Sequence, residues 1–177
     1  ITQKIHVKNK CYWITGLSAT GKTTISKLLT DHLRASKRKV VLLDGDELRS
    51  VFHSNSNTRE DRLARGFKYS ELCKLLVNQE IDVIIAVIGL FKELHEWNRR
   101  NIPNYIEVFI DTPLSELKNR DPKNLYRDFD LGKIKNMAGL NIKADYPLQP
   151  DIHLKWSSRK NVDIMFDELL DKLRLKN

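Results

Sequence analysis

The chain has 177 residues, of which 41% are hydrophobic, and it carries a formal net charge of +8. At this length we expect one domain spanning residues 1–177. No run reaches the roughly 18 apolar residues of a membrane span, and the positive charges are spread along the chain rather than gathered in one block. We therefore expect polyanionic small molecules as partners, rather than nucleic acid or a membrane.

The cysteines and the N-terminal residues indicate where the protein works. Cys11 and Cys73 fall in a predicted strand and a predicted helix, and neither belongs to a metal-binding spacing. Residues 1–10 contain no apolar signal core. These features predict two reduced core cysteines and a cytoplasmic location.

Buried strands alternate with amphipathic helices along the chain. The strands are expected at 11–15, 39–44, 81–88, 105–111 and 151–154, and the helices at 24–35, 46–52, 58–78, 92–100, from 112 onward and from about 161 to 175. Thr58 and Thr112 are the expected caps of the helices that they begin, and Leu75 is expected to face inward. This order predicts an α/β fold in which helices cover both faces of a parallel sheet of about five strands.

The segment 120–148 is long, charged and rich in turn residues. Such a stretch inside a compact domain is usually a functional loop. A cation at its start, Arg120, can close over a phosphate and exclude water. We expect the segment to be a mobile lid, with a solvated loop as the alternative.

The first predicted strand is followed by Gly16-Leu17-Ser18-Ala19-Thr20-Gly21-Lys22-Thr23, which fits the phosphate-binding pattern G-x-x-x-x-G-K-[ST] without a mismatch. In this pattern backbone N–H groups surround phosphate oxygens at the positive end of a helix. Lys22 can reach the outer phosphates, and the hydroxyl of Thr23 can bind Mg²⁺. The loop predicts a P-loop nucleoside-kinase-like fold with an ATP site formed by Gly16, Ser18, Ala19, Thr20, Gly21, Lys22, Thr23, Thr24 and, from the lid, Arg120.

Asp44-Gly45-Asp46 directly follows the second predicted strand. Two carboxylates beside a triphosphate can organise Mg²⁺ or accept a proton from an attacking hydroxyl. Capping of the next helix is the alternative, and it suits only one of the two. We predict Lys22 and Asp46 as catalytic residues, and Thr23 and Asp46 as metal ligands.

Two arginines follow the carboxylates. Arg49 lies one helical turn after Asp46, and Arg62 lies near the start of the next predicted helix. Their guanidinium groups suit phosphate or sulfate oxygens. Simple solvation on a helix surface is the alternative for each.

These and several further runs make the chain resemble the adenylylsulfate kinase family over roughly residues 12–154. The phosphate loop is shared by many families. The more specific runs are Leu43-Asp44-Gly45-Asp46 with Arg49, Asp61-Arg62, Glu107-Val108-Phe109-Ile110-Asp111-Thr112-Pro113-Leu114, Arg120-Asp121-Pro122-Lys123 with Leu125-Tyr126, and Gly132-Lys133-Ile134-Lys135-Asn136 with Gly139. The resemblance implies a homodimer that uses Mg²⁺ to transfer the ATP γ-phosphate to the ribose 3′-hydroxyl of a second nucleotide.

The resemblance also implies roles on the acceptor side. Asp46 would lie nearest the attacking hydroxyl, Arg49 and Arg62 would hold the acceptor nucleotide, and Lys123 and Lys135 would be among the cations of the lid. The predicted acceptor site comprises Asp44, Arg49, Arg62, Arg65, Ile88, Lys123, Lys135 and Met137.

Four positions depart from the family pattern. Gly89 replaces a serine, which excludes a covalent route through that side chain and leaves in-line transfer. Asn57 and Met137 replace two phenylalanines that sandwich the adenine of adenylylsulfate in the family, and Arg65 replaces an asparagine.

These changes cluster at the acceptor base, whereas the residues for ATP and for transfer are kept. We therefore expect the same reaction on a cytidine 5′-diphosphoramidate-type nucleotide, the acceptor of some family relatives in bacterial capsule modification. One alternative is an adenylylsulfate kinase whose sequence has drifted. Another is a nucleotide-binding regulatory module without kinase activity.

Overall fold

The computed structural model describes residues 8–54 and 56–174. The elements follow one another in the order β1 (Cys11–Thr15), α1 (Lys22–Ala35), β2 (Val40–Asp44), α2 (Gly45–Val51), α3 (Arg59–Asn78), β3 (Asp82–Val87), α4 (Lys92–Asn101), β4 (Tyr105–Asp111), α5 (Leu114–Arg120), α6 (Leu125–Asp130), β5 (Ile152–Lys155) and α7 (Val162–Arg174). The prediction made for residues 1–10 falls mostly outside the described ranges. Within those ranges, no helix is long and apolar enough to cross a membrane.

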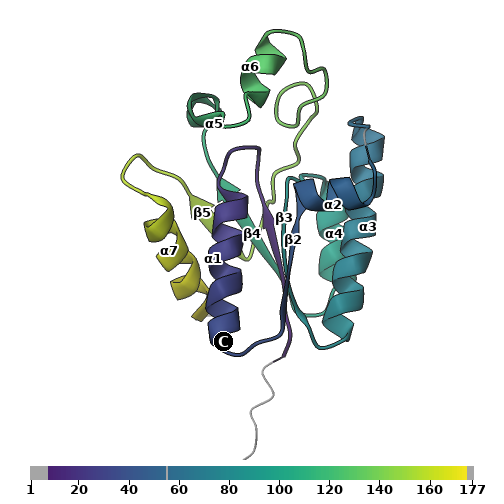
Figure 1. Cartoon of the computed structure of the whole chain (residues 1–177), viewed down its shortest axis with the longest axis vertical. Coiled ribbons are helices and arrows are strands. Elements are labelled where there is room, and N and C mark those ends of the chain that lie inside the picture. Colours follow the sequence, from purple (N-terminus) through teal and green to yellow (C-terminus); the bar gives the residue numbers. More distant parts are fainter. Residues whose placement is uncertain (1–7, 55, 175–177) are drawn as a thin grey trace, which may run out of the picture.

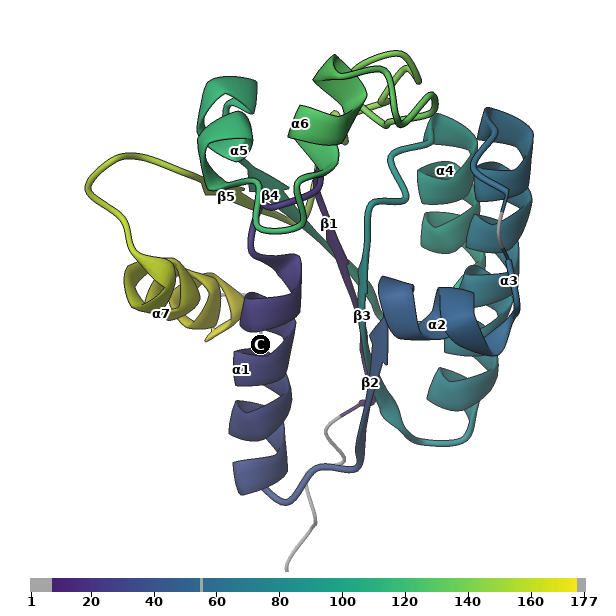
Figure 2. The same ribbon diagram turned by 45° about the horizontal axis from the view of Figure 1, so that its top comes forward.

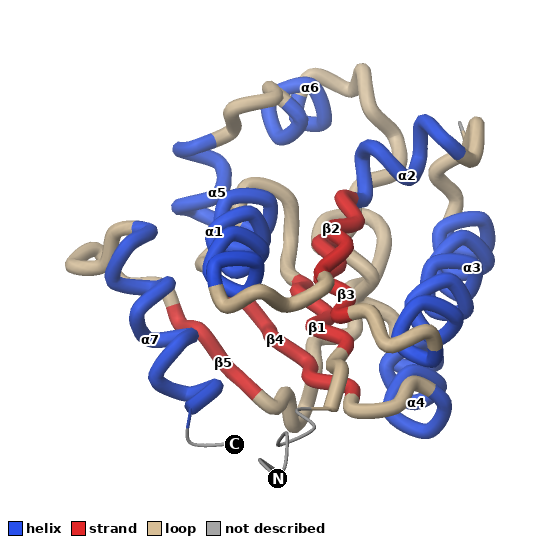
Figure 3. Tube along the Cα trace, turned by 60° about the horizontal axis from the view of Figure 1, so that its bottom comes forward, coloured by secondary structure: helices blue, strands red, loops and turns tan. Residues whose placement is uncertain are grey.

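The five strands form one parallel sheet in the order β2-β3-β1-β4-β5. α1 and α7 cover one face, and α3 and α4 cover the other (Figures 1 and 3). Thr15, at the end of the central strand β1, lies beside Val87 of β3 and Phe109 of β4. The carboxyl ends of the strands therefore share one edge, where the loops that follow them meet. The predicted fold class is confirmed.

Alternate residues of β1 point to opposite faces of the sheet and contribute to two hydrophobic cores. Tyr12 and Ile14 pack with residues of α1 and α7, whereas Cys11 and Trp13 pack with residues of α3 and α4. Both cysteines are free and buried, as predicted. Because both faces of the sheet are covered, its central strands are apolar over most of their length rather than alternating.

α3 presents a different inward face from the one predicted. Tyr69, Cys73 and Val77 recur every four residues and are buried against the sheet. Leu75 is 56% exposed, so the prediction that it faces inward is wrong. Two residues along a helix are about 200° apart around its axis, which turns Leu75 away from the face that holds Cys73.

The two predicted threonine caps have different outcomes. The hydroxyl of Thr58 accepts a hydrogen bond from the backbone N–H of Asp61 at 3.2 Å and caps α3. Thr112 does not cap α5, so that prediction is wrong. Pro113 occupies the N-cap position with an extended backbone (φ −57°, ψ 141°), and helix α5 begins one residue later. The hydroxyl of Thr112 is buried with no hydrogen-bond partner in the described part of the chain.

The segment 120–148 crosses the carboxyl edge of the sheet, and we call these residues the roof (Figure 2). The roof contains a short helix, α6, that was not predicted. It is anchored by a third hydrophobic cluster of Leu17, Leu90, Phe109, Leu117, Tyr126, Met137 and Ala138. The hydroxyl of Tyr126 also donates a hydrogen bond to the backbone oxygen of Ser18 at 3.0 Å. The roof thus contacts the phosphate loop, and its mobility as a lid stays a prediction.

Candidate active site

A cavity of about 730 Å³ lies between the carboxyl edge of the sheet and the roof. Its volume is within the range of small-molecule sites. Most of the predicted site residues line it, namely Ser18, Ala19, Gly21, Lys22, Thr23, Thr24, Asp44, Asp46, Arg49, Arg62, Arg65, Ile88, Lys123 and Met137. The structure therefore brings together residues that are far apart in the sequence, from the phosphate loop, α2, α3, the end of β3 and the roof.

Four predicted site residues do not line the cavity: Gly16, Thr20, Arg120 and Lys135. Gly16 and Thr20 belong to the phosphate loop itself. Arg120 flanks the loop, since its Nη1 donates to the backbone oxygen of Ala19 at 3.3 Å. Lys135 is exposed, and the structure does not bring it to the cavity.

The phosphate loop is shaped by its backbone. Gly21, at the N-cap of α1, has φ 94°, a left-handed conformation that side chains disfavour. The next residue begins α1, so the N–H groups of its first turn are free for an anion. The ammonium of Lys22 donates to the backbone oxygen of Leu17 at 2.6 Å. Desolvation by the surrounding loop lowers the pKa of Lys22 to about 8.

The two carboxylates after β2 have different partners. Asp44 caps α2, because its Oδ1 accepts from the backbone N–H of Asp46 at 2.9 Å, and its Oδ2 accepts from the hydroxyl of Thr23 at 2.8 Å. Asp46 is paired with Arg49 of α2 and with Lys123 of the roof. Partial burial alone would raise the pKa of Asp46, but these two cations hold it below the usual value. Asp46 is therefore ionised at neutral pH.

Oxygen ligands suitable for Mg²⁺ surround the phosphate loop. The hydroxyl of Thr23 and the carboxylates of Asp44 and Asp46 all line the cavity, and hard oxygen donors are what Mg²⁺ prefers. Within the described ranges, no group of three or more His, Cys, Asp or Glu side chains is arranged to hold a metal by itself. These residues fit an ion that takes part of its coordination from nucleotide phosphates. We predicted the pair Thr23 and Asp46, whereas the structure links Thr23 to Asp44.

Arg62 and Arg65 face the cavity from one side of α3. Arg62 donates from Nε to the backbone oxygen of Asn57 and from Nη2 to that of Asn136, both at 2.9 Å. Arg65 donates from Nη1 to the hydroxyl of Ser54 at 2.6 Å.

Desolvation lowers the pKa of both α3 arginines, and the neighbouring guanidinium groups, Arg49 among them, lower it further. Neither Arg62 nor Arg65 makes a salt bridge within the described residues. Buried cations without such a partner favour an anionic ligand.

Sequence reasoning missed two aromatic residues of the cavity wall. Trp13 and Tyr69 both line the cavity, and each has a buried polar atom without a hydrogen-bond partner in the described part of the chain. Tyr69 follows Arg62 by seven residues, so helical periodicity would have placed the two side chains on one face of α3. Trp13 gave no such signal, because it occupies a strand that reads as core.

Gly89 follows β3 and lines the cavity. Its φ is +47°, and a Cβ there would lie 3.1 Å from the ring of Trp13. Its backbone oxygen is 2.7 Å from Nε2 of His95. A side chain at this position would therefore be strained as well as crowded.

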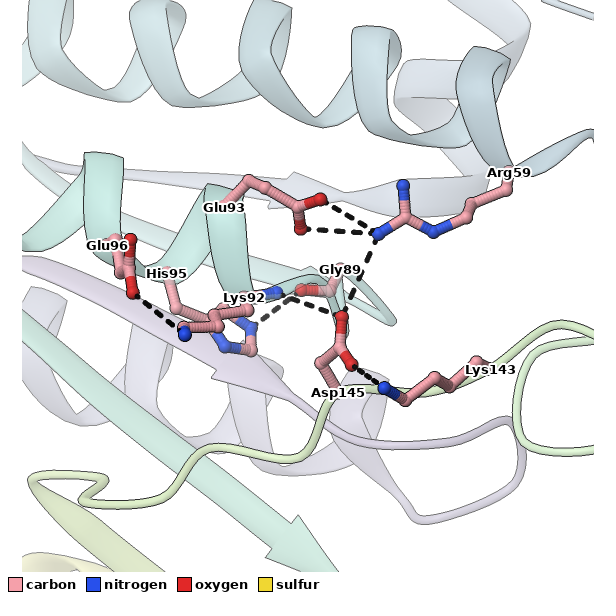
Figure 4. Close-up of polar contacts among 8 residues, drawn as sticks. All are labelled: Arg59, Gly89, Lys92, Glu93, His95, Glu96, Lys143 and Asp145. Atoms are coloured by element: carbon pink, nitrogen blue, oxygen red, sulfur yellow. Dashed lines mark hydrogen bonds and ion pairs between the residues drawn. The ribbon is translucent and has the colours of Figure 1, made fainter.

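A polar network holds the trailing end of the roof to α3 and α4 (Figure 4). Asp145 lies 3.8 Å from Arg59 and 3.4 Å from Lys143, and its Oδ2 accepts from the backbone N–H of Lys92 at 3.3 Å. Arg59 also pairs with Glu93 at 2.9 Å. Both ends of the roof thus contact the rest of the domain, through Lys123 and Asp46 near its start and through this network near its end.

Taken together, a phosphate loop under a cationic roof, with carboxylates at the next strand end, is the arrangement of P-loop kinases. These enzymes transfer the terminal phosphoryl group of ATP. The chain matches the family described as adenylylsulphate kinase over residues 8–155, and it belongs to that family.

Individual relatives differ in the acceptor that their names state. A cytidine diphosphoramidate kinase of Campylobacter jejuni is 34% identical over 171 residues, which cover 96% of this chain and 100% of that protein. An adenylyl-sulfate kinase of Pseudomonas aeruginosa is 41% identical over 143 residues, 79% of this chain and 73% of that protein. The solved Mycobacterium tuberculosis APS kinase CysC, in complex with AMPPNP and APS, superposes with a TM-score of 0.86 at 28% identity and covers 94% of this chain and 98% of that one. The chain is therefore an ATP-dependent phosphotransferase, a nucleotide kinase of the adenylylsulfate kinase type.

Proposed function

We propose that the protein transfers the γ-phosphate of ATP to the ribose 3′-hydroxyl of a cytidine 5′-diphosphoramidate-type nucleotide. The observation that carries this proposal is the composition of the acceptor side. Asn57 and Met137 line the cavity at the two positions where the family resemblance implies phenylalanines. A pyrimidine offers less surface for stacking than a purine and so depends less on two aromatic walls. The likeness to the Campylobacter jejuni relative over the whole of that protein supports the same acceptor.

On the donor side, the phosphate loop and Lys22 bind the triphosphate. The oxygen atoms of Thr23, Asp44 and Asp46 hold Mg²⁺, which neutralises charge on the phosphates when it is bound. Arg120 adds a cation beside the loop. Lys22 lies at the helix N-terminus, where its ammonium can follow the charge that develops on the transferred group.

On the acceptor side, Asp46 accepts a hydrogen bond from the attacking 3′-hydroxyl and orients it. Because its pKa is held low, it acts mainly by position and charge; phosphoryl transfer with a loose transition state needs little from a base. Arg49, Arg62 and Arg65 bind the anionic 5′ groups of the acceptor. Gly89 carries no nucleophile, so the phosphoryl group passes directly between the two bound nucleotides.

Three features inferred from the sequence remain proposals. The roof moves as a lid over both substrates, the chain is one kinase domain over residues 1–177, and two copies form a homodimer.

Adenylylsulfate is the second candidate acceptor, favoured by the 41% identity to the Pseudomonas aeruginosa adenylyl-sulfate kinase. The test is a screen of acceptors with ATP and Mg²⁺ in which ADP release is followed and the phosphorylated position is identified by NMR. We expect the highest kcat/KM for cytidine 5′-diphosphoramidate. A higher kcat/KM for adenylylsulfate would establish the second candidate. ATP binding without stimulation by any acceptor would instead favour a regulatory module.

A further inference from the structure

The cavity wall contains a buried polar atom that nothing in the described part of the chain satisfies. The side-chain oxygen of Asn57, Oδ1, is buried and accepts no hydrogen bond, and Asn57 lines the cavity. Burying a hydrogen-bond acceptor without a donor costs free energy. A hydroxyl can turn its proton toward another partner, whereas a carbonyl oxygen can only accept. A ligand in the cavity that donates a hydrogen bond would satisfy it.

In this segment, the printed hydrogen bonds of the two neighbouring arginines of α3 go to oxygens other than Oδ1 of Asn57. Arg62 donates from Nε to the backbone oxygen of Asn57 at 2.9 Å. Arg65 donates from Nη1 to the backbone oxygen of Ser56 at 3.1 Å and to the hydroxyl of Ser54 at 2.6 Å. These bonds fix the backbone before α3 from two sides. Asn57 is therefore held in place before a ligand arrives, which favours its use in recognition.

The same arginine connects Asn57 to a second part of the cavity lining, in the roof. Nη2 of Arg62 donates to the backbone oxygen of Asn136 at 2.9 Å, and the next residue is Met137, which is 6% exposed and lines the cavity. Met137 is itself fixed, since its backbone N–H donates to Oδ1 of Asn141 at 2.8 Å. One guanidinium thus holds a polar wall and an apolar, polarizable wall together. A polar wall and an apolar wall of this kind suit a flat heterocycle with a polar edge.

Other buried unsatisfied atoms in the described chain do not share this position. Those of Ser70, Asn98 and Thr112 belong to residues that do not line the cavity, whereas those of Trp13, Asn57 and Tyr69 do. Trp13 supplies only a donor, and the hydroxyl of Tyr69 can donate or accept. Asn57 supplies the lone-pair acceptor that an amino group requires.

We propose that Asn57 is a specificity-determining residue whose Oδ1 accepts a hydrogen bond from the exocyclic amino group of the acceptor base. This inference rests on the proposed function, in which the acceptor is a nucleotide bound between Asn57 and Met137. Cytosine carries an amino group at position 4, whereas uracil carries a carbonyl oxygen there. With the amide in the orientation of the structure, the site accepts an amino-pyrimidine and disfavours a keto-pyrimidine, because uracil would place two oxygens against each other and leave Oδ1 unsatisfied.

Calorimetric titration with CDP and UDP tests the inference without requiring catalysis. The protein is first saturated with a non-hydrolysable ATP analogue and Mg²⁺, so that neither probe occupies the phosphate loop. We expect CDP to bind about 10- to 100-fold more tightly than UDP. Equal affinities in the unmodified protein, or no binding of either nucleotide, would overturn the inference.

Substitutions at Asn57 show which atom is responsible. Asn57→Asp keeps an acceptor oxygen and should keep the preference for CDP, whereas Asn57→Leu removes it and should bring the two affinities within about threefold. Asn98→Ala removes a buried amide away from the cavity whose Oδ1 also lacks a partner in the described chain, and it should leave the ratio unchanged. Thermal unfolding of each variant confirms that it folds. Loss of the preference in Asn57→Asp, or its retention in folded Asn57→Leu, would also overturn the inference.

The outcome is separable from that of the proposed function. A preference for CDP without phosphoryl transfer to any acceptor would contradict the proposed function and support the role of Asn57. Equal transfer to matched cytidine and uridine acceptors would contradict the role of Asn57 and leave the kinase reaction in place.

Discussion

The phosphate loop and the proposed acceptor wall, formed by Asn57, Arg62, Arg65 and Met137, line one cavity but achieve their shapes by different means. The loop is set by backbone geometry, with Gly21 in a left-handed conformation at the start of α1. The acceptor wall is built from side chains of the segment before α3, of α3 itself and of the roof, and Arg62 holds them together through backbone oxygens on both sides. Side chains at such a wall can change without altering the loop. This difference allows one phosphoryl-transfer apparatus to serve different acceptors.

The largest effect should come from Asp46, which lies between the phosphate loop and the proposed acceptor wall. Asp46→Asn removes the charge that pairs with Lys123 and Arg49 while the volume is kept, and kcat should fall about 10²- to 10⁴-fold. The affinity for an ATP analogue should stay within about threefold, since the loop itself is intact. Stopped-flow assays of ADP release and calorimetric titration measure the two quantities. Glu47→Gln, an exposed neighbour outside the cavity wall, is the matched control, and full turnover in Asp46→Asn would remove Asp46 from the mechanism.

Changing the acceptor wall should alter acceptor binding alone. Met137→Phe supplies an aromatic face, and stacking of a base on it should tighten acceptor binding about 5- to 100-fold, for adenylylsulfate as well as for a cytidine nucleotide. The Kd of the ATP analogue should not change. Met165→Phe on α7 is the matched control, because Met165 is also 6% exposed but lies in the core beside α1. An unchanged acceptor Kd in a folded Met137→Phe protein would show that this wall does not contact the base.

The affinity of the phosphate loop for an ATP analogue should depend on pH. In the free protein, desolvation lowers the pKa of Lys22 to about 8, so the ammonium is present below that pH and is lost above it. Triphosphate stabilises the ammonium and raises its pKa, so binding above pH 8 takes up a proton. The affinity for the ATP analogue should then fall by up to about tenfold per pH unit from about pH 8 upward.

Calorimetry in two buffers of different ionisation enthalpy measures this proton uptake directly. Lys22→Arg, whose cation does not titrate in this range, should bind with an affinity independent of pH. A constant affinity in the unmodified protein, without proton uptake, would contradict the role assigned to the Lys22 ammonium.

The sequence predicted most of the geometry of the ATP site and less of that of the proposed acceptor site, for a physical reason. The phosphate loop is a local pattern: its glycines, its lysine and the helix after it are consecutive, so the spacing alone specifies the geometry. Thr15 and Phe109 are neighbours in the sheet but lie far apart in the sequence. The apolar runs around them were nevertheless enough to predict a parallel sheet. Local patterns thus carry the fold and the ATP site.

The acceptor wall depends on contacts between residues far apart in the chain. The partners of Arg62 at Asn57 and Asn136 could not be derived from spacing, because they require the roof to fold back over α3. The link between Thr23 and Asp44 was missed for the same reason: it joins the first turn of α1 to the end of β2. Lys135 is the reverse case, and its role stays a prediction. A motif placed it in the acceptor site, whereas the backbone of the roof leaves it exposed.

The smallest effect is expected from the polar contacts that join the end of the roof to α3 and α4. Asp145→Asn keeps an acceptor for the backbone N–H of Lys92 but removes the charge that faces Arg59 and Lys143. Exposed ion pairs contribute less than about 1 kcal/mol. The acceptor KM should therefore rise by no more than about fivefold, less at high salt, while the ATP KM is unchanged.

Steady-state kinetics at low and high salt make this measurement, and Asp163→Asn at the exposed start of α7 is the control. A rise of about a hundredfold or more would mean that the network of Figure 4 positions the acceptor wall rather than merely fastening the roof. A similar rise in the ATP KM would mean that the phosphate loop and the proposed acceptor wall are not independent. Because Asp145 contacts α3 and α4 but neither the phosphate loop nor α1, the structure favours an effect confined to the acceptor.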